Sequence, residues 1–268
     1  MYNTFYLSWE PAFMQWLQSA LGAFGETVMP IFSMLGEELI LIAVLGFIYW
    51  SLDKEAGIYI GNALVVSVTW NPMLKNIALR ARPYFVHKEI VCLKPVDASA
   101  DIYDIAKQGF SFPSGHSANS SSVYASIALY WKKRALTILC AAAIFLVGIS
   151  RFCLGVHYPS DVIAGWLLGL AAAGITALLS KAIKNYWLFA AVLLAGALPG
   201  LFYCKTTDYF TGLGMLIGYL LAVPFERRFV KFENTKKILP MILRVLGGII
   251  IYFALNSLLK LPFSDAFL

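Results

Sequence analysis

The chain has 268 residues, of which 60% are hydrophobic and 13% are charged, and its mean hydropathy is +0.72. This composition excludes an ordinary soluble domain, and several apolar runs approach the ~20 residues needed to cross a bilayer. The formal net charge of +6 comes mostly from short basic loops. Membrane orientation explains that charge better than nucleic-acid binding, so we expect no nucleic-acid partner.

The N-terminal segment, residues 1–36, contains no lysine or arginine and is rich in aromatic residues. Glu10 and Glu26 interrupt its apolar run. We therefore expect a helix that lies in the membrane interface, with an additional membrane span as the alternative.

The rest of the chain is a series of apolar runs separated by short polar connections. We predict an all-α fold, a polytopic transmembrane helical bundle of about eight spans. We expect residues 37–180 to form a membrane core of about five to six helices that carries the polar motifs, and residues 181–268 to add three C-terminal helices. Gly165 and Gly169 are spaced for close contact between two helices. The predicted spans are 37–52, 56–74, 114–131, 135–152, 159–179, 187–203, 210–224 and 238–259.

A long polar loop, residues 80–113, interrupts the predicted core. Loops of this length without secondary structure are uncommon in compact domains and are usually functional. We therefore expect a lid or a substrate gate over any site on this side of the membrane.

Basic residues mark one side of the predicted bundle. With eight spans, they lie in short connections on the side opposite to loop 80–113, and the positive-inside rule makes their side cytoplasmic. The polar motifs described below then face the exoplasm, which is the periplasm, the cell exterior or an organelle lumen. The basic residues are Lys54, Lys132, Lys133, Arg134, Lys181, Lys184, Arg227, Arg228, Lys231, Lys236 and Lys237.

One polar motif, residues 150–161, stands between two long apolar runs, where ionisable groups are costly unless they are used. Pro159 favours a helix start, so Asp161 falls in the first turn and His157 lies just before it. A carboxylate there can accept the imidazole N–H and leave the other ring nitrogen free as a base or nucleophile. Arg151 adds a planar cation suited to phosphate. A buried pair that only closes a helix end is the alternative.

Two further motifs add cations and a helix start. Lys75 is followed after six residues by Arg82 and a proline. The tetrapeptide Pro-Ser-Gly-His contains Ser114 as a helix N-cap, Gly115 and His116. Glycine lets a backbone N–H approach an anion, and the positive end of the helix points at the same place. His116 in the first turn is placed to donate a proton.

Together these motifs resemble the type 2 phosphatidic acid phosphatase superfamily, also called the acid phosphatase/vanadium haloperoxidase superfamily. The family pattern of K-x6-R-P, P-S-G-H and S-R-x5-H-x3-D is present in order and without a departure. The resemblance extends from about Gly36 to Gly174, and three spaced motifs are highly specific. Arg80 lies inside the first motif but outside the family pattern, and we expect it to be a peripheral charge.

The resemblance implies an integral-membrane lipid phosphatase that works through a phosphohistidine. In this mechanism His157 attacks phosphorus, Asp161 orients it, and His116 protonates the leaving oxygen and then helps to activate water. No metal and no other cofactor is implied, because the cations take that role, and the motifs have no adjacent cluster with metal-ligand spacing. The implied phosphate-binding residues are Lys75, Arg82, Ser114, Gly115 and Arg151.

The leading prediction is hydrolysis of a lipid phosphate monoester or diphosphate, because a site at the bilayer surface can meet a lipid head group. A lipid phosphotransferase, in which an acceptor hydroxyl replaces water at His157, is one alternative. A carrier that reuses the scaffold is another. Phosphatidic acid, phosphatidylglycerophosphate, undecaprenyl diphosphate and sphingoid phosphates all fit the motifs, which predict no particular oligomeric state.

Overall fold

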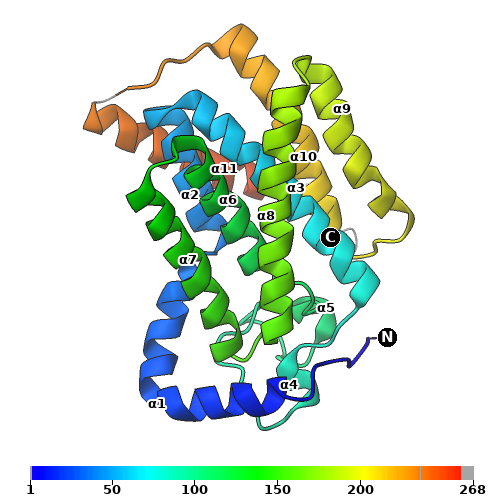
Figure 1. The fold of residues 1–268 in the computed structure, drawn as a ribbon. Coiled ribbons are helices and arrows are strands. Elements are labelled where there is room, and N and C mark those ends of the chain that lie inside the picture. Colours follow the sequence, from blue (N-terminus) through cyan, green and yellow to red (C-terminus); the bar gives the residue numbers. More distant parts are fainter. Residues whose placement is uncertain (1, 236, 261–268) are drawn as a thin grey trace.

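The computed structural model describes residues 2–235 and 237–260, and the predicted all-α fold is confirmed (Figure 1). Lys236 of the predicted basic side and residues 261–268 of the predicted C-terminal part lie outside the described residues. The α-helices are α1 (Glu10–Met34), α2 (Glu38–Phe47), α3 (Lys54–Ala78), α4 (Pro83–Val86), α5 (Ile105–Gln108), α6 (Gly115–Trp131), α7 (Arg134–Cys153), α8 (Pro159–Ala182), α9 (Tyr186–Ala197), α10 (Thr207–Phe225) and α11 (Ile238–Lys260).

Helix α6 lies at the centre of the bundle and packs against α3, α7 and α8 (Figure 1). Small residues make this packing close. A Cβ atom on Gly165 would lie 2.6 Å from the carbonyl oxygen of Ser114, and one on Gly169 would lie 2.1 Å from that of Ala118. The two glycines of α8 therefore let the start of α6 and the start of α8 meet at one end of the bundle, as their spacing predicted.

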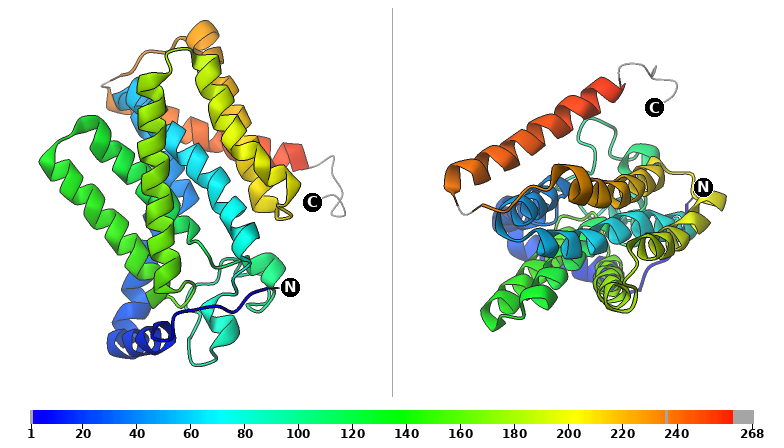
Figure 2. Two further views of the ribbon diagram at one scale, coloured as in Figure 1. Left: turned by 45° about the vertical axis from the view of Figure 1, so that its right-hand side comes forward. Right: turned by 90° about the horizontal axis from the view of Figure 1, so that it is seen from above.

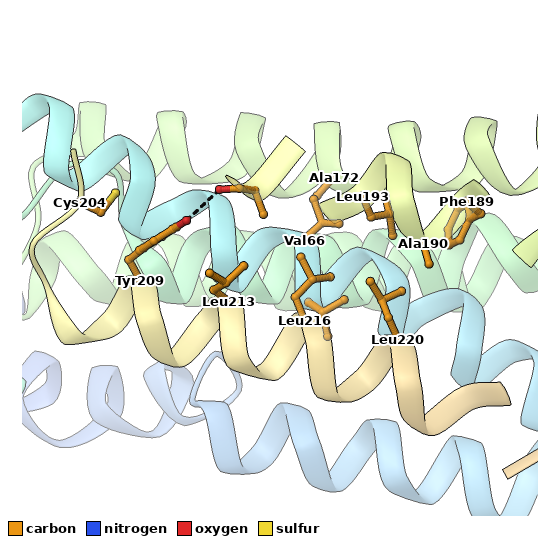
Figure 3. Close-up of a cluster of buried hydrophobic side chains, with 12 residues drawn as sticks. Val66, Ala172, Phe189, Ala190, Leu193, Cys204, Tyr209, Leu213, Leu216 and Leu220 are labelled. Atoms are coloured by element: carbon orange, nitrogen blue, oxygen red, sulfur yellow. Dashed lines mark hydrogen bonds between the residues drawn. The ribbon is translucent and has the colours of Figure 1, made fainter. Parts of the chain in front are cut away.

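Helices α9 and α10 extend the core through a separate apolar cluster (Figure 3). Leu213, Leu216 and Leu220 of α10 pack with Val66 of α3 and with Phe189 of α9. The hydroxyl of Tyr209 donates a hydrogen bond of 2.9 Å to the carbonyl oxygen of Ala197, which ties α10 to the end of α9 (Figure 3). Helix α11 lies along the outside of the bundle (Figure 2).

The N-terminal segment forms the predicted helix, but the helix is broken. Gly22 has a positive φ of 46° and a ψ of −137°, which interrupts α1. The first part of α1 crosses the lower end of the bundle and the second part turns upward toward α2 (Figure 1). A second bend of 43° separates α1 from the segment Glu38–Leu52, which ends in a π-helical turn.

Within the described part of the chain, four helices are long and apolar enough to cross a membrane, or up to five if the bent pair of α1 and α2 is counted as one span. The four are α7, α8, α10 with the turn that follows it, and α11. Helix α6 has 17 residues, several of them serine, and α9 has 12 residues before a 3-10 turn. These helices are shorter or more polar than the predicted spans assumed.

Loop 80–113 folds at the end of the bundle where α3 ends and α6 and α8 begin (Figure 1). It contains the short helices α4 and α5. Gln108 is fully buried, and its side-chain carbonyl accepts hydrogen bonds from the backbone N–H groups of Val96 (2.9 Å) and Asp97 (3.2 Å). The buried side-chain amide of Gln108 therefore joins α5 to the middle of the loop and stabilises the loop conformation.

Candidate active site

The three sequence motifs meet at this end of the bundle. Helix α3 ends at Ala78, and Leu79 after it has a positive φ of 49°, so the chain leaves the helix direction between Lys75 and Arg82. The backbone N–H of Ser114 donates to the carbonyl oxygen of Asp161 at 3.0 Å. The amide of Asn71 in α3 donates to the carbonyl oxygen of Pro113 at 3.2 Å. The first bond joins the second and third motifs, and the second bond ties the helix that carries Lys75 to the second motif. Arg82 of the first motif reaches the third motif by donating to the carbonyl oxygen of Val156 at 2.9 Å.

His157 lies at the centre of the group and is 2% exposed. Its Nε2 atom is 3.3 Å from Nη1 of Arg82, and a guanidinium can only donate. Nε2 is therefore the acceptor, and the proton sits on Nδ1. Nδ1 faces Oγ of Ser111 at 3.4 Å and Oδ2 of Asp161 at 3.5 Å, both of which can accept it.

The protonation state of His157 follows from its surroundings. Burial holds the pKa of His157 well below its usual value of 6.5, and three nearby positive charges lower this pKa further. The charges belong to Arg82, Arg151 and Lys75. The imidazole is therefore neutral at physiological pH, with an unprotonated Nε2 atom among three cations.

Asp161 is fully buried, and each of its oxygen atoms is occupied. Oδ2 accepts the backbone N–H of Tyr158 at 2.8 Å and the hydroxyl of Ser111. Oδ1 accepts a hydrogen bond of 2.6 Å from Arg80. The carboxylate thus caps the first turn of α8 and lies beside His157, with the Ser111 hydroxyl bonded to it on the same side.

The three predicted phosphate-binding cations differ in how they are held. Arg82 donates to the carbonyl oxygens of Gln108 (2.9 Å) and Val156 (2.9 Å), so it also anchors loop 80–113. Arg151 donates to the hydroxyl of Ser33 in α1, and its buried Nε has no hydrogen-bond partner among the described residues. Lys75 is half-buried in the last turn of α3.

The start of α6 supplies the second predicted motif. The Ser114 hydroxyl caps the helix by accepting the backbone N–H of Ser117 at 3.4 Å. A Cβ atom on Gly115 would meet only Oδ1 of Asn71, at 3.5 Å, so the backbone there is open. The first N–H groups of a helix have no partner within the helix, and together with the positive end of α6 they favour an anion.

His116 lies beside Arg151 in a pocket of about 300 Å³. Lys94 of the loop and Glu37 before α2 form an ion pair at its wall. The pocket gives the His116 side of the site room for a group larger than phosphate. Its lining is Glu37, Glu38, Leu39, Lys94, Pro95, Val96, His116 and Arg151.

The expectation that Arg80 is a peripheral charge is wrong. Arg80 is 1% exposed and forms ion pairs with Asp161 (2.6 Å) and Glu10 (3.1 Å). Ser111 was not recognised from the sequence either, although it stands three residues before the Ser114 cap and abuts the second motif. Among the described residues, histidine, cysteine, aspartate and glutamate side chains do not gather in groups of three or more that could hold a metal ion.

Two family models match the sequence. Residues 56–185 match the model of the PAP2 superfamily, and residues 210–268 match the model described as the transmembrane extension of PAP2 superfamily phosphatases. The chain belongs to the PAP2 superfamily. It is a multi-pass membrane protein, and the extension corresponds to α10 and α11 and the residues that follow.

Individual proteins agree with this assignment. The chain is 36% identical over 91 residues to phosphatidylglycerophosphatase B of Bacillus subtilis, covering 31% of this chain and 45% of that protein. It is 29% identical over 143 residues to undecaprenyl-diphosphatase of Sulfolobus acidocaldarius, covering 53% and 64% respectively. The chain thus spans roughly half the length of these curated relatives. The crystal structure of Aquifex aeolicus LpxE has the same fold, with a TM-score of 0.57 and 21% identity over 66% of this chain and 99% of that one.

Proposed function

We propose that this PAP2 protein is a membrane phosphatase that hydrolyses a lipid phosphate monoester or diphosphate through a phosphohistidine. The observation that carries the proposal is the position of His157, whose buried imidazole has an unprotonated Nε2 atom 3.3 Å from Nη1 of Arg82, where a bound phosphoryl group can take over the contact with the guanidinium. Burial and the charges of Arg82, Arg151 and Lys75 lower the pKa of His157, which keeps the imidazole neutral. A neutral imidazole is a nucleophile, and the cations can bind the phosphoryl group that it attacks.

In the first step, the lone pair of Nε2 of His157 attacks phosphorus. The P–N bond forms as the bond from phosphorus to the leaving oxygen breaks, and His116 donates a proton to that oxygen. Burial and nearby cations lower the pKa of His116, so its protonation depends on the negative charge of the bound phosphoryl group, which raises that pKa again. Lys75, Arg82 and Arg151, with the N–H groups at the start of α6, neutralise the charge on the equatorial oxygens. The negative charge of Asp161, 3.5 Å from Nδ1, stabilises the imidazole as it becomes positively charged.

In the second step, a water molecule attacks the phosphohistidine on phosphorus. His116, now unprotonated, takes a proton from this water, the P–N bond breaks, and His157 returns to its neutral form with phosphate released. Because all of the positive charge comes from side chains and a helix end, we propose that the reaction needs no metal ion and no other cofactor.

We further propose eight membrane crossings, with the site on the exoplasmic face and the N-terminal segment in the interface. Residues 37–180 then act as the catalytic unit, and residues 181–268 as additional helices. The basic connection Lys132–Arg134 supports this orientation, because it lies at the end of α6 opposite to His116, ~25 Å away at 1.5 Å per residue. With Cys92→Ser in both proteins, because this native thiol lies in the same loop, Ser99→Cys should react with an impermeant maleimide on intact cells and Lys133→Cys on this connection should not.

The substrate class is supported by the relatives and by the pocket beside His116. The relatives are named for phosphatidylglycerophosphate and undecaprenyl diphosphate, which are lipids with a phosphate monoester and a diphosphate. The pocket of about 300 Å³ is lined by Lys94 and two glutamates, so it can hold the polar part of the lipid that leaves when its bond to phosphorus breaks.

The test is phosphate release by the detergent-purified protein from a panel of lipid phosphates and diphosphates, with a chelator present. We expect release that survives chelation, and a decrease of ~10³-fold or more in the rate for His157→Ala. Release that requires added metal would refute the mechanism. If phosphate appears only when an alcohol acceptor is supplied, and then as a new ester, the protein is a phosphotransferase. If no lipid is turned over while transport persists in His157→Ala, it is a carrier.

A further inference from the structure

The N-terminal residues before α1 cross the site in an extended conformation. The backbone N–H of Asn3 donates to the carbonyl oxygen of Leu79 at 2.7 Å, and the backbone N–H of Ala81 donates to the carbonyl oxygen of Asn3 at 2.8 Å. This short bridge joins Asn3 to Arg80 and so places the N-terminal segment, which lies outside the matched family model, beside Arg80.

Arg80 is enclosed on every side. Its guanidinium lies between the rings of Phe5 and Tyr158, with its central carbon 4.7 Å and 4.1 Å from the two ring centroids. Nε donates to the carbonyl oxygen of Phe5 at 2.7 Å, and Nη1 donates to Ser160 at 2.8 Å and to Asp161 at 2.6 Å. A planar group with fixed donors suits this arrangement, and a lysine does not.

Glu10 completes the arrangement at the first residue of α1. Its side chain is fully buried, and Oε2 accepts from Nη2 of Arg80 at 3.1 Å. Oε1 accepts the backbone N–H of Ser160 at 2.7 Å, next to Asp161 in α8. The carboxylate therefore binds both the arginine and the helix turn that carries Asp161.

We infer that Arg80 and Glu10 are positioning residues for the nucleophile, acting through Asp161. This inference rests on the proposed function. Arg80 binds Oδ1 of Asp161 and leaves Oδ2 to face Ser111 and His157. A buried carboxylate needs a partner for its charge, and a fixed guanidinium sets both its charge and its orientation. Through Glu10 and Arg80, the N-terminal segment thus helps to orient Asp161, and Asp161 orients the imidazole of His157 for attack on phosphorus.

The test is a double-mutant cycle on phosphate release. We expect Arg80→Gln to lower kcat ~10 to 100-fold, with KM and the inhibition constant of inorganic phosphate unchanged within about threefold, because the phosphate-binding cations stay in place. In an Asp161→Asn background the same substitution should lower kcat less than about threefold, since Arg80 acts through Asp161. Equal effects in both backgrounds would overturn the inference.

Two milder variants cover the case in which Arg80→Gln does not fold. Arg80→Lys keeps the charge but loses the planar set of N–H donors of the guanidinium. Glu10→Gln keeps the size of the side chain but removes its negative charge. Each should lower kcat per folded protein by ~3 to 30-fold. The matched control is Arg227→Gln, which breaks an exposed ion pair with Glu55 at 2.6 Å. That pair lies at the other end of α3 from Arg80, and the 25 residues of this helix extend ~37 Å at 1.5 Å per residue, so kcat should not change.

A second measurement does not depend on turnover. The chain has three histidines, so 15N labelling of imidazole gives three ring systems to observe by NMR. In the wild-type protein we expect His157 as the Nδ1–H tautomer; Arg80→Gln should change its 15N shifts, and Arg227→Gln should not. Unchanged His157 shifts in Arg80→Gln would overturn the inference. Absence of phosphate release by a wild-type protein with the expected shifts would overturn the proposed function alone.

Discussion

The close contact between α6 and α8 predicts that an added methyl group will destabilise the protein at Gly169 of α8 but not at Gly174 of the same helix. A Cβ atom at Gly169 would lie 2.1 Å from both the carbonyl oxygen of Ala118 and Oγ of Ser121. At Gly174, one and a half turns further along α8, no atom lies within 4 Å of the added carbon. Gly169→Ala and Gly174→Ala therefore make the same chemical change in one helix, with and without a clash.

The magnitude follows from two opposing effects. Replacing glycine by alanine inside a helix stabilises it by ~1 kcal/mol at either position. Ordinary contacts between carbon and a carbonyl oxygen are ~3.3 Å long, so at Gly169 the helices must separate by about 1 Å. Overpacking of this kind costs ~1 to 3 kcal/mol, and the upper end applies because one of the clashing atoms is backbone. We expect Gly169→Ala to be ~2 to 3 kcal/mol less stable than Gly174→Ala.

Thermal unfolding in detergent measures the difference. For a chain of this size, ~2 to 3 kcal/mol corresponds to a Tm difference of roughly 5 to 10 °C. Phosphate release should respond as well, because α8 carries Asp161 and α6 carries His116, and a displacement of ~1 Å between reacting groups costs up to 10²-fold in rate. Equal Tm and equal kcat for the two variants would refute the close packing of α6 and α8 on which the site geometry depends.

Three shorter predictions concern the site itself. Ser111→Ala removes the hydroxyl bonded to Asp161, and kcat should fall ~10-fold with an unchanged KM in steady-state assays. Below pH 6.5 the unfolded chain protonates His157 and the folded protein does not, so stability should fall by up to ~1.4 kcal/mol per pH unit. His157→Asn should remove this part of the slope in melts from pH 5 to 7.5, and parallel slopes would contradict it. Lys94→Ala breaks the ion pair with Glu37 and should raise KM several-fold with little change in kcat; a change in kcat alone would place Lys94 elsewhere in the reaction.

The family and the all-α fold were predictable because their signals are local. Three spaced motifs of four to twelve residues identify the superfamily, and apolar runs identify the helices. The number of spans is less accessible, because hydropathy does not show where a helix breaks. Gly22 interrupts α1, and the serine-rich start of α6 shortens its apolar part. The roles of the motif residues stay predictions until the variants are measured.

Arg80 could not be assigned from sequence because burial of an arginine is decided by distant partners. Its two carboxylates stand 70 and 81 residues away along the chain, and no periodicity links them. Hydropathy marks Arg80 and Glu10 as charges that should face water, and each would be costly to bury alone. Only the fold brings Arg80 and Glu10 together, and their ion pair offsets the free-energy cost of removing each charge from water.

The same arrangement explains how the N-terminal segment is held against the site. A buried ion pair by itself is weak support for stability, because replacement by apolar residues of similar volume is often neutral. Here the guanidinium also holds one oxygen of Asp161, and the glutamate also holds the first turn of α8. These bonds fix the direction of the second oxygen toward His157. Apolar residues in place of Arg80 and Glu10 would fill the same volume but would not orient the carboxylate of Asp161. The buried charges of this pair are therefore best explained by the orientation that they give to Asp161.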